Sequence, residues 1–84
     1  MSVEDTLKER GNRYGEFKGH SALAQGMKGV LRCEPKYHHL DYAKLEAIEM
    51  ILHKIARIVN GDPNYKDNWH DIQGYAKLAE DLCE

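Results

Sequence analysis

The stretch from Asp41 to Gly61, DYAKLEAIEMILHKIARIVNG, decides the fold of this 84-residue chain. Asp41 is a favourable residue to cap the start of a helix, and Gly61 stands where a helix commonly ends. Between them the apolar residues step by three and four, as one face of an α-helix requires. These residues are Leu45, Ile48, Leu52, Ile55 and Val59. We therefore predict a helix over residues 41–60 whose buried apolar stripe is centred near Ile55.

Two further segments have a weaker helical pattern, residues 21–32 and 67–82. In the second segment six positions are expected to be buried: Trp69, Ile72, Tyr75, Ala76, Ala79 and Leu82. Before them, residues 1–20 are expected to form a short helix capped by Ser2, followed by a glycine-rich loop or a broken helix. Three glycines in this segment suggest the interruption: Gly11, Gly15 and Gly19.

No segment alternates in the manner of a β-strand, so residues 1–84 are predicted to form one all-α domain. The expected architecture is a small antiparallel bundle or hairpin of two long helices, with one or two shorter N-terminal helices. Hydrophobic residues make up 42% of the chain, which favours a folded domain over a disordered tail. A chain this short buries only about 60–65% of its unfolded surface. We therefore expect a homo-oligomer, a dimer or larger.

The charge balance excludes a general polyanion binder. Twelve lysines and arginines stand against 14 aspartates and glutamates, a net charge of −2. No direct DNA binding is expected. The N-terminal residues lack the apolar core of a secretory signal, and no stretch approaches the ~20 apolar residues of a membrane span. Cys33 and Cys83 lie outside any CxxC pair, which is typical of reduced thiols; a structural disulfide or a zinc site is the alternative. These features predict a cytoplasmic protein without a membrane partner.

Polar residues gather on the side of the 41–60 helix opposite Ile55. They are Glu46, Glu49, His53, Arg57 and Asn60. One interpretation is a solvated helix face with pairing between successive turns. The other is a ligand or metal face that a partner helix or a second subunit turns inward. Glu46 and Glu49 lie one turn apart and together suit a hard divalent cation such as Mg²⁺.

Asp71 lies at the rim of the apolar side of the 67–82 helix, with Asp67 one turn earlier. A carboxylate drawn toward a core is costly unless it is paired, hydrogen-bonded or bound to a metal. Asp71 is therefore expected either to pair with Lys54 or Arg57, or to bind a ligand or metal. Asp67 has the further alternative of capping the helix.

Residues 10–17, RGNRYGEF, combine two arginines with two aromatic residues and two glycines. Arginine forks bind phosphate in two-point contacts, and an aromatic ring can stack on a base. Arg10, Arg13 and Tyr14 are therefore candidate ligand-binding residues. The alternative is a structural loop in which Tyr14 and Phe17 pack on the core and the arginines pair with the acidic helices.

Three motifs together resemble a family of small proteins from tailed bacteriophages and prophages. The motifs are RGxRYGxF at residues 10–17, KIARI at 54–58 and DIxGYA at 71–76. If the chain is encoded by a phage, this resemblance implies a location in the cytoplasm of the host cell.

The last two predicted helices are also similar to the all-α, MazG-like nucleotide pyrophosphohydrolases. That superfamily holds Mg²⁺ with an ExxE motif on one helix and an ExxD motif on the next. Glu46-Ala-Ile-Glu49 has the spacing of the first motif, and Asp71 stands for the aspartate of the second. Asn68 occupies the place of the second motif's glutamate, while Asp67 offers a carboxylate one residue earlier.

The resemblances lead to three hypotheses. In the first, the chain hydrolyses nucleoside triphosphates, with Mg²⁺ on Glu46, Glu49, Asp67 and Asp71 and with Asp71 as the catalytic residue. The phosphates would contact Arg10, Arg13, Lys54 and Arg57, and a base would stack on Tyr14 or Tyr75. In the second, the same residues bind a nucleotide signal without cleaving it. In the third, the chain is a non-enzymatic phage protein that inhibits a host or defence protein.

Overall fold

A computed structural model describes residues 2–84. It confirms the all-α prediction for this part of the chain; Met1, the first residue of the expected 1–20 segment, lies outside it. The elements are α1 (Val3–Tyr14), α2 (Phe17–Arg32), the 3₁₀ helix η1 (Pro35–His39), α3 (Tyr42–Asn60) and α4 (Lys66–Asp81). None of the described helices is long and apolar enough to cross a membrane.

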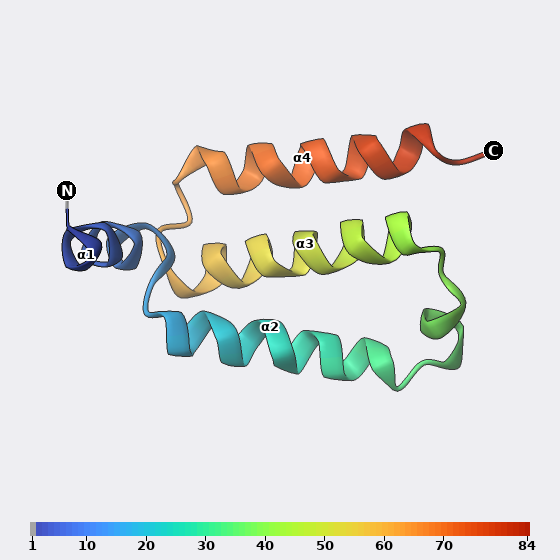
Figure 1. Ribbon diagram of the computed structural model, residues 1–84, viewed down its shortest axis with the longest axis horizontal. Coiled ribbons are helices and arrows are strands. Elements are labelled where there is room, and N and C mark those ends of the chain that lie inside the picture. Colours follow the sequence, from blue (N-terminus) through green and yellow to red (C-terminus); the bar gives the residue numbers. More distant parts are fainter. Residues whose placement is uncertain (1) are drawn as a thin grey trace.

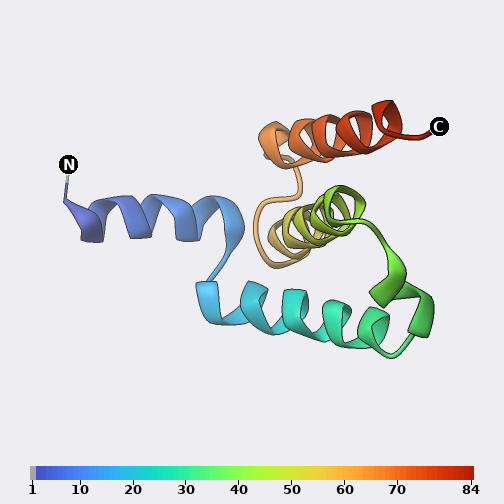
Figure 2. The same cartoon turned by 45° about the vertical axis from the view of Figure 1, so that its right-hand side comes forward.

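Helices α2, α3 and α4 lie side by side in one layer with α3 in the middle (Figure 1). Consecutive helices run in opposite directions, while α1 projects from the end of the layer where α2 begins (Figure 2). The three helices of the layer contain 16, 19 and 16 residues. The chain therefore has three helices of similar length, where two long ones and shorter N-terminal ones were expected.

Helix α3 begins and ends at the residues that the sequence indicates. The side chain of Asp41 accepts a hydrogen bond from the backbone N–H of Lys44 at 2.9 Å, which satisfies one of the free donors of the first turn. At the other end, the N–H of Gly61 donates to the carbonyl oxygen of Arg57 at 2.9 Å. Both ends of the central helix are thus fixed by local hydrogen bonds.

The N-terminal region differs from the prediction. Gly11 lies inside α1, because an exposed helix tolerates one glycine at a cost of about 1 kcal/mol. The chain turns instead at Gly15, whose φ of 80° favours glycine. Helix α2 then begins at Phe17, four residues before the predicted start at Ser21. The expected loop over residues 11–20 is therefore the end of one helix, a short turn and the beginning of the next.

The core of the layer is small. Its buried hydrophobic residues are Ala24, Tyr37, Ala47, Ala56 and Ile58. The alanines let α2 and α4 approach the flanks of α3 closely, so the arc between these flanks is left open. Ile48 and Ile55 on this arc are only half-buried, and Val59 is 69% exposed. The prediction that the stripe forms the core is therefore wrong at Val59 and incomplete at the isoleucines.

The same arrangement corrects the predicted burial of α4. Trp69 and Leu82 are 51% and 55% exposed, and Ala76 is exposed as well. The remaining three predicted positions, Ile72, Tyr75 and Ala79, are half-buried. Helix α4 contacts only one flank of α3. Only the side of α4 that faces this flank can be buried, so apolar residues on its other sides stay exposed.

Candidate ligand-binding cleft

The corner between α1 and α2 is held by Asn60, the last residue of α3. Its side-chain Nδ2 donates hydrogen bonds to the carbonyl oxygens of Tyr14 at 3.3 Å and Glu16 at 2.9 Å. Gly15, with its positive φ, packs so closely that a Cβ there would overlap the backbone oxygen of Asn60. A Cβ on Gly19 would stand 2.6 Å from Oδ1 of Asn60. The glycines at these two positions therefore allow the corner to close on the end of α3.

A second set of backbone contacts fixes α1 to the turn after α3. The N–H of Asp62 donates to the carbonyl oxygen of Arg13 at 2.9 Å. A Cβ on Gly61 would overlap the backbone of Tyr14, so only glycine fits at this crossing. These contacts hold the C-terminal turn of α1 next to the first turn of α2 and the last turns of α3.

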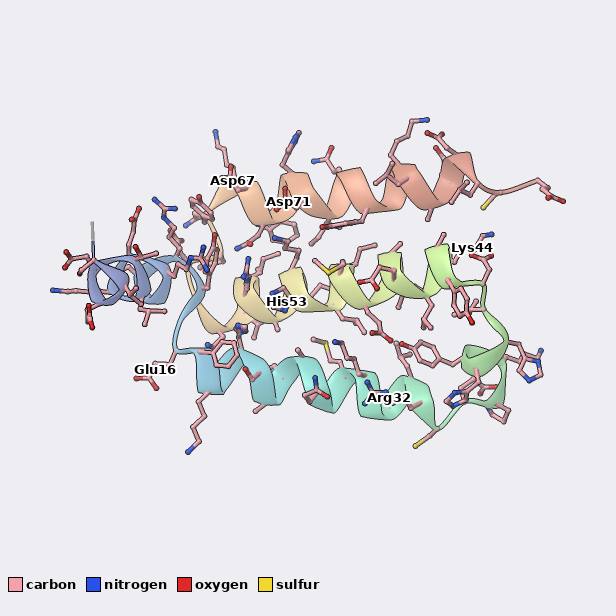
Figure 3. All side chains as sticks on the ribbon, in the orientation of Figure 1. Glu16, Arg32, Lys44, His53, Asp67 and Asp71 are labelled. Carbon is pink, nitrogen blue, oxygen red and sulfur yellow. The ribbon has the colours of Figure 1, made fainter. Side chains whose placement is uncertain are left out.

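The result is a cleft of about 520 Å³ at the junction of the three helices. Its walls combine aromatic, apolar and cationic side chains with two histidines. The lining residues are Leu7, Arg10, Gly11, Tyr14, Gly15, Glu16, Phe17, His20, His53 and Arg57. Figure 3 places Glu16 at the corner and His53 on α3. The volume lies in the range of small-molecule sites, about 300–1,000 Å³.

Arg57 is the cation that the junction orients most strongly. The Cζ atom of its guanidinium lies 4.1 Å from the centroid of the Tyr14 ring, in a cation–π contact. Its Nε is buried and has no hydrogen-bond partner. Among the ion pairs of residues 2–84 none involves Arg57 or Arg10. No carboxylate within residues 2–84 therefore pairs with either guanidinium of the cleft.

Two histidines form the floor of the cleft where α2 meets α3. His20 is 5% exposed, and its ring centroid lies 5.0 Å from that of His53 in an edge-to-face contact. Phe17 packs on the other side of His20, also with centroids 5.0 Å apart. The Nδ1 atom of His20 is buried without a hydrogen-bond partner. A buried polar atom of this kind is unusual, because most such atoms find a partner.

Burial and positive neighbours lower the pKa of both histidines, which favours the neutral form of each ring. Loss of hydration lowers the pKa of His53 to about 4, and the positive charges of Arg57 and Lys54 act in the same direction. The pKa of His20 is lowered first by burial and then by Arg57. Each neutral ring offers one N–H donor and one acceptor nitrogen to its surroundings.

The structure brings together three of the six predicted ligand-binding residues. Arg10, Tyr14 and Arg57 line the cleft. Arg13 points to the turn before α4, where its Cζ lies 5.1 Å from the ring centroid of Tyr65 and it pairs with Glu9. Lys54 and Tyr75 are directed to the seam between α3 and α4.

Lys54 and Asp71 join α3 to α4. The Nζ of Lys54 lies 2.9 Å from Oδ2 of Asp71, so the ion pair considered from the sequence is present. The hydrogen bond from Lys54 lowers the pKa of Asp71 against a smaller effect of burial. The Lys54 side chain is 11% exposed and that of Asp71 43%. The buried ammonium group of Lys54 is therefore paired with a carboxylate that is partly exposed to solvent.

The carboxylates predicted to bind Mg²⁺ have separate partners. Glu49 accepts a hydrogen bond from the Tyr37 hydroxyl at 2.8 Å, and its other oxygen lies 3.9 Å from Nζ of Lys28. Asp67 accepts from the Tyr65 hydroxyl at 2.9 Å, and Glu46 is exposed. Figure 3 shows Asp67 and Asp71 together at the beginning of α4. Over the described residues, no three His, Cys, Asp or Glu side chains form a group that could hold a metal ion.

Sequence reasoning missed the contribution of His20 to the cleft and the role of Asn60 as a clamp. It did place His53, Arg57 and Asn60 on one face of α3, and a partner helix of the same chain covers that face. A helical start at Phe17 would have put His20 beside Ala24 on the same side of α2. The signal was therefore present but hidden by the expected loop over residues 11–20.

The comparisons with known proteins identify a class by sequence rather than by activity. Residues 3–83 match the family described as "Domain of unknown function (DUF6378)". The chain belongs to this family, since the match covers nearly its whole length. No curated protein and no solved structure matches the chain.

Proposed function

We propose that the chain binds a nucleotide, or another ligand that joins phosphate to a flat ring, in the cleft between α1, α2 and α3. The observation that carries this proposal is the pair of buried nitrogens without partners, Nδ1 of His20 and Nε of Arg57. Both belong to residues that line the same cleft. Buried polar groups are normally satisfied by protein, water or ligand. In this proposal a polar ligand supplies the partners of these two nitrogens, after a small shift of the cleft side chains that opens access to them.

The arginines suit the phosphate part of such a ligand. A guanidinium presents several N–H donors in a fixed fork, which matches two oxygens of one phosphate. Arg57 is held against Tyr14 before any ligand arrives, so less freedom is lost on binding. Arg10 stands on the facing wall. Neutral His20 and His53 can add hydrogen bonds from the floor.

The aromatic and apolar walls suit the ring part. Phe17 and Leu7 line the cleft although they are 77% and 62% exposed. Stacking of a base on an aromatic side chain contributes about 1–3 kcal/mol. A ligand with a base at this wall and phosphate at the arginines covers apolar surface that water otherwise contacts.

The proposal is one of binding without hydrolysis. The MazG-like resemblance implied Mg²⁺ on four carboxylates, but Glu49, Asp67 and Asp71 are each engaged by a different protein group. A catalytic metal site needs ligands that converge on one position with room left for water or substrate. We therefore assign no bond-breaking step to Asp71.

The phage resemblance gives this binding a setting. A small cytoplasmic protein that holds a nucleotide without consuming it would sequester a host signal and lower its free concentration. Inhibition of a host or defence protein through a helical surface is the alternative, and it predicts no small-molecule ligand.

Calorimetry of the whole chain against inorganic phosphate and a panel of mono-, tri- and cyclic nucleotides tests the proposal. Arg57→Gln and Arg10→Gln are each expected to weaken binding about tenfold or more, since hydrogen bonds to charged groups contribute about 1.5–3 kcal/mol. Arg32→Gln is the matched control, because Arg32 is exposed at the far end of α2 (Figure 3). Silence of the wild type across the panel would overturn the proposal, as would equal loss in all three variants.

A second assay addresses hydrolysis directly. The wild type and Asp71→Asn are incubated with Mg²⁺ and deoxynucleoside triphosphates, and pyrophosphate is measured. We expect no release by either protein. Release by the wild type that Asp71→Asn abolishes would replace the binding proposal with the MazG-like one.

A further inference from the structure

We infer that a second copy of this chain packs on the apolar face of the helical layer. This face is formed by side chains of α2, α3 and α4 that no other element of residues 2–84 covers. We define it by six residues: Leu23, Val30, Ile48, Ile55, Val59 and Trp69. The inference does not rest on the proposed function, because the cleft opens on the other side of the layer.

Helix rotation places these residues on one side. At about 100° per residue, His53 and Ala56 of α3 face α2, and the Ile48–Ile55–Val59 stripe lies about a quarter-turn away from them. Rotation in the opposite sense reaches Glu46 and Arg57, and Arg57 lines the cleft. The stripe and the cleft are therefore on opposite surfaces of the layer.

The flanking helices extend the stripe. On antiparallel α2, the same rotation puts Leu23 and Val30 on the stripe side of the seam formed by His20 and Ala24; these two residues are 39% and 73% exposed. On α4, Trp69 lies on the stripe side, away from Asp71 and Gly74. Three adjacent helices thus present apolar side chains in one direction.

The accessible surface of the chain is larger than that of a compact monomer of the same mass. The chain exposes 6325 Å², whereas a monomer of its mass is expected to expose about 5,100 Å². The excess is about 1,200 Å² per chain, and it includes the surface of the projecting helix α1, which has no buried residue. Two copies together therefore have enough excess surface for the lower end of obligate homodimer interfaces, about 2,000 Å² in total. The radius of gyration, 14.4 Å, likewise exceeds the value of about 12 Å for a compact domain of this length. Domains usually bury their apolar faces between two layers, and one layer is present here.

A second copy fits this face better than a charged partner. Between Leu45 and Val59 the exposed arc of α3 carries only isoleucine, leucine and valine, so two such arcs meet without like charges. A two-fold axis through the face makes the same patch serve both subunits. The second chain then provides the missing layer of the core.

Sedimentation equilibrium of the full chain at micromolar concentration tests the inference. We expect twice the chain mass of 9.7 kDa. Val30→Lys and Val59→Lys are each expected to weaken the dimer at least about tenfold, because each would bury two uncompensated charges at the interface. Both side chains are so exposed in the single chain, at 73% and 69%, that lysine is accommodated there without disturbing α2 or α3.

Leu78→Lys is the matched control. Leu78 is 63% exposed on the cleft side of α4, so this variant is expected to remain a dimer. A monomeric wild type would overturn the inference, and so would an assembly that only Leu78→Lys dissociates. The wild type alone gives a further readout: its thermal midpoint is expected to rise with protein concentration, and a constant midpoint would contradict a dimer coupled to folding.

Discussion

The two seams along α3 treat their polar groups in opposite ways. At the α3–α4 seam, buried Lys54 is paired with Asp71 at 2.9 Å. At the junction of α3 with α1 and α2, Arg57 has no ion pair among the described residues and its Nε has no acceptor. The fold therefore depends on both members of the pair at the first seam, because removal of one partner would leave a buried charge uncompensated. At the junction the guanidinium of Arg57 contacts the Tyr14 ring but has no acceptor for its Nε among the described residues. This difference is the reason why we propose the ligand site at the junction of α1, α2 and α3 rather than at the α3–α4 seam.

The largest expected effect breaks the junction itself. Gly61→Ala places a Cβ against the backbone of Tyr14. Backbone atoms cannot rotate away from the new methyl group as a flexible side chain could. We expect a loss of stability on the order of 2–4 kcal/mol together with loss of ligand binding, because α1 no longer holds its wall of the cleft. Chemical denaturation and calorimetry measure the two effects. Unchanged ligand binding in this variant would contradict the expectation that the cleft depends on the α1–α2 corner.

The second effect is the pH dependence of the junction. The unfolded chain protonates His53 near pH 6.5, whereas the folded chain does so only near its pKa of about 4. The unfolded state therefore binds more protons between these values, and stability falls as the pH is lowered through this window. The shift corresponds to about 3.4 kcal/mol at most. Solvent screening of the partly exposed ring reduces the expected loss to about 2–3 kcal/mol. Denaturation is measured at several pH values between 7.5 and 4. The free energy of unfolding is expected to depend less on pH in His53→Gln than in the wild type.

The third effect is at the paired seam. Asp71→Asn leaves Lys54 buried without its counter-charge, and we expect a loss of about 1–3 kcal/mol, moderated by the exposure of Asp71. Nucleotide binding at the cleft is expected to be unchanged. A variant with native stability but impaired binding would instead bring Asp71 into the site.

The smallest effect goes in the other direction. Gly74 lies inside α4 with open space around the position of a Cβ. Gly74→Ala is expected to raise the stability of the chain by roughly 0.5–1 kcal/mol, since alanine favours the helix. Thermal denaturation measures it. Because the same substitution at Gly61 is expected to be harmful, the pair distinguishes a glycine required by packing from one that is not.

The limits of sequence reasoning follow from the range of the contacts. Helix α3 could be predicted because its caps and periodicity are local: Asp41 bonds to Lys44, and Gly61 bonds to Arg57. The α1–α2 corner could not, because it depends on Asn60, more than forty residues from the carbonyl groups it binds. Likewise, the chemistry of the side chains was enough to select Arg10, Tyr14 and Arg57 as candidates. Their position in one cleft could not be predicted, because it depends on the α1–α2 corner. Lys54 and Tyr75 shared that chemistry and face the other seam.

Helix α1 has no buried residue, although it supplies a wall of the cleft. Its attachment is therefore concentrated at its C-terminal end, in a few hydrogen bonds and in the ring contacts that Arg13 and Tyr14 make. Segments held in this way open at a free energy well below that of global unfolding, so amide hydrogen exchange should be fastest in α1 and slowest in α3. A bound ligand that contacts both helices would slow exchange in α1 by coupling its opening to ligand release. The weakest part of the fold is thus the part whose protection reports most directly on occupancy of the site.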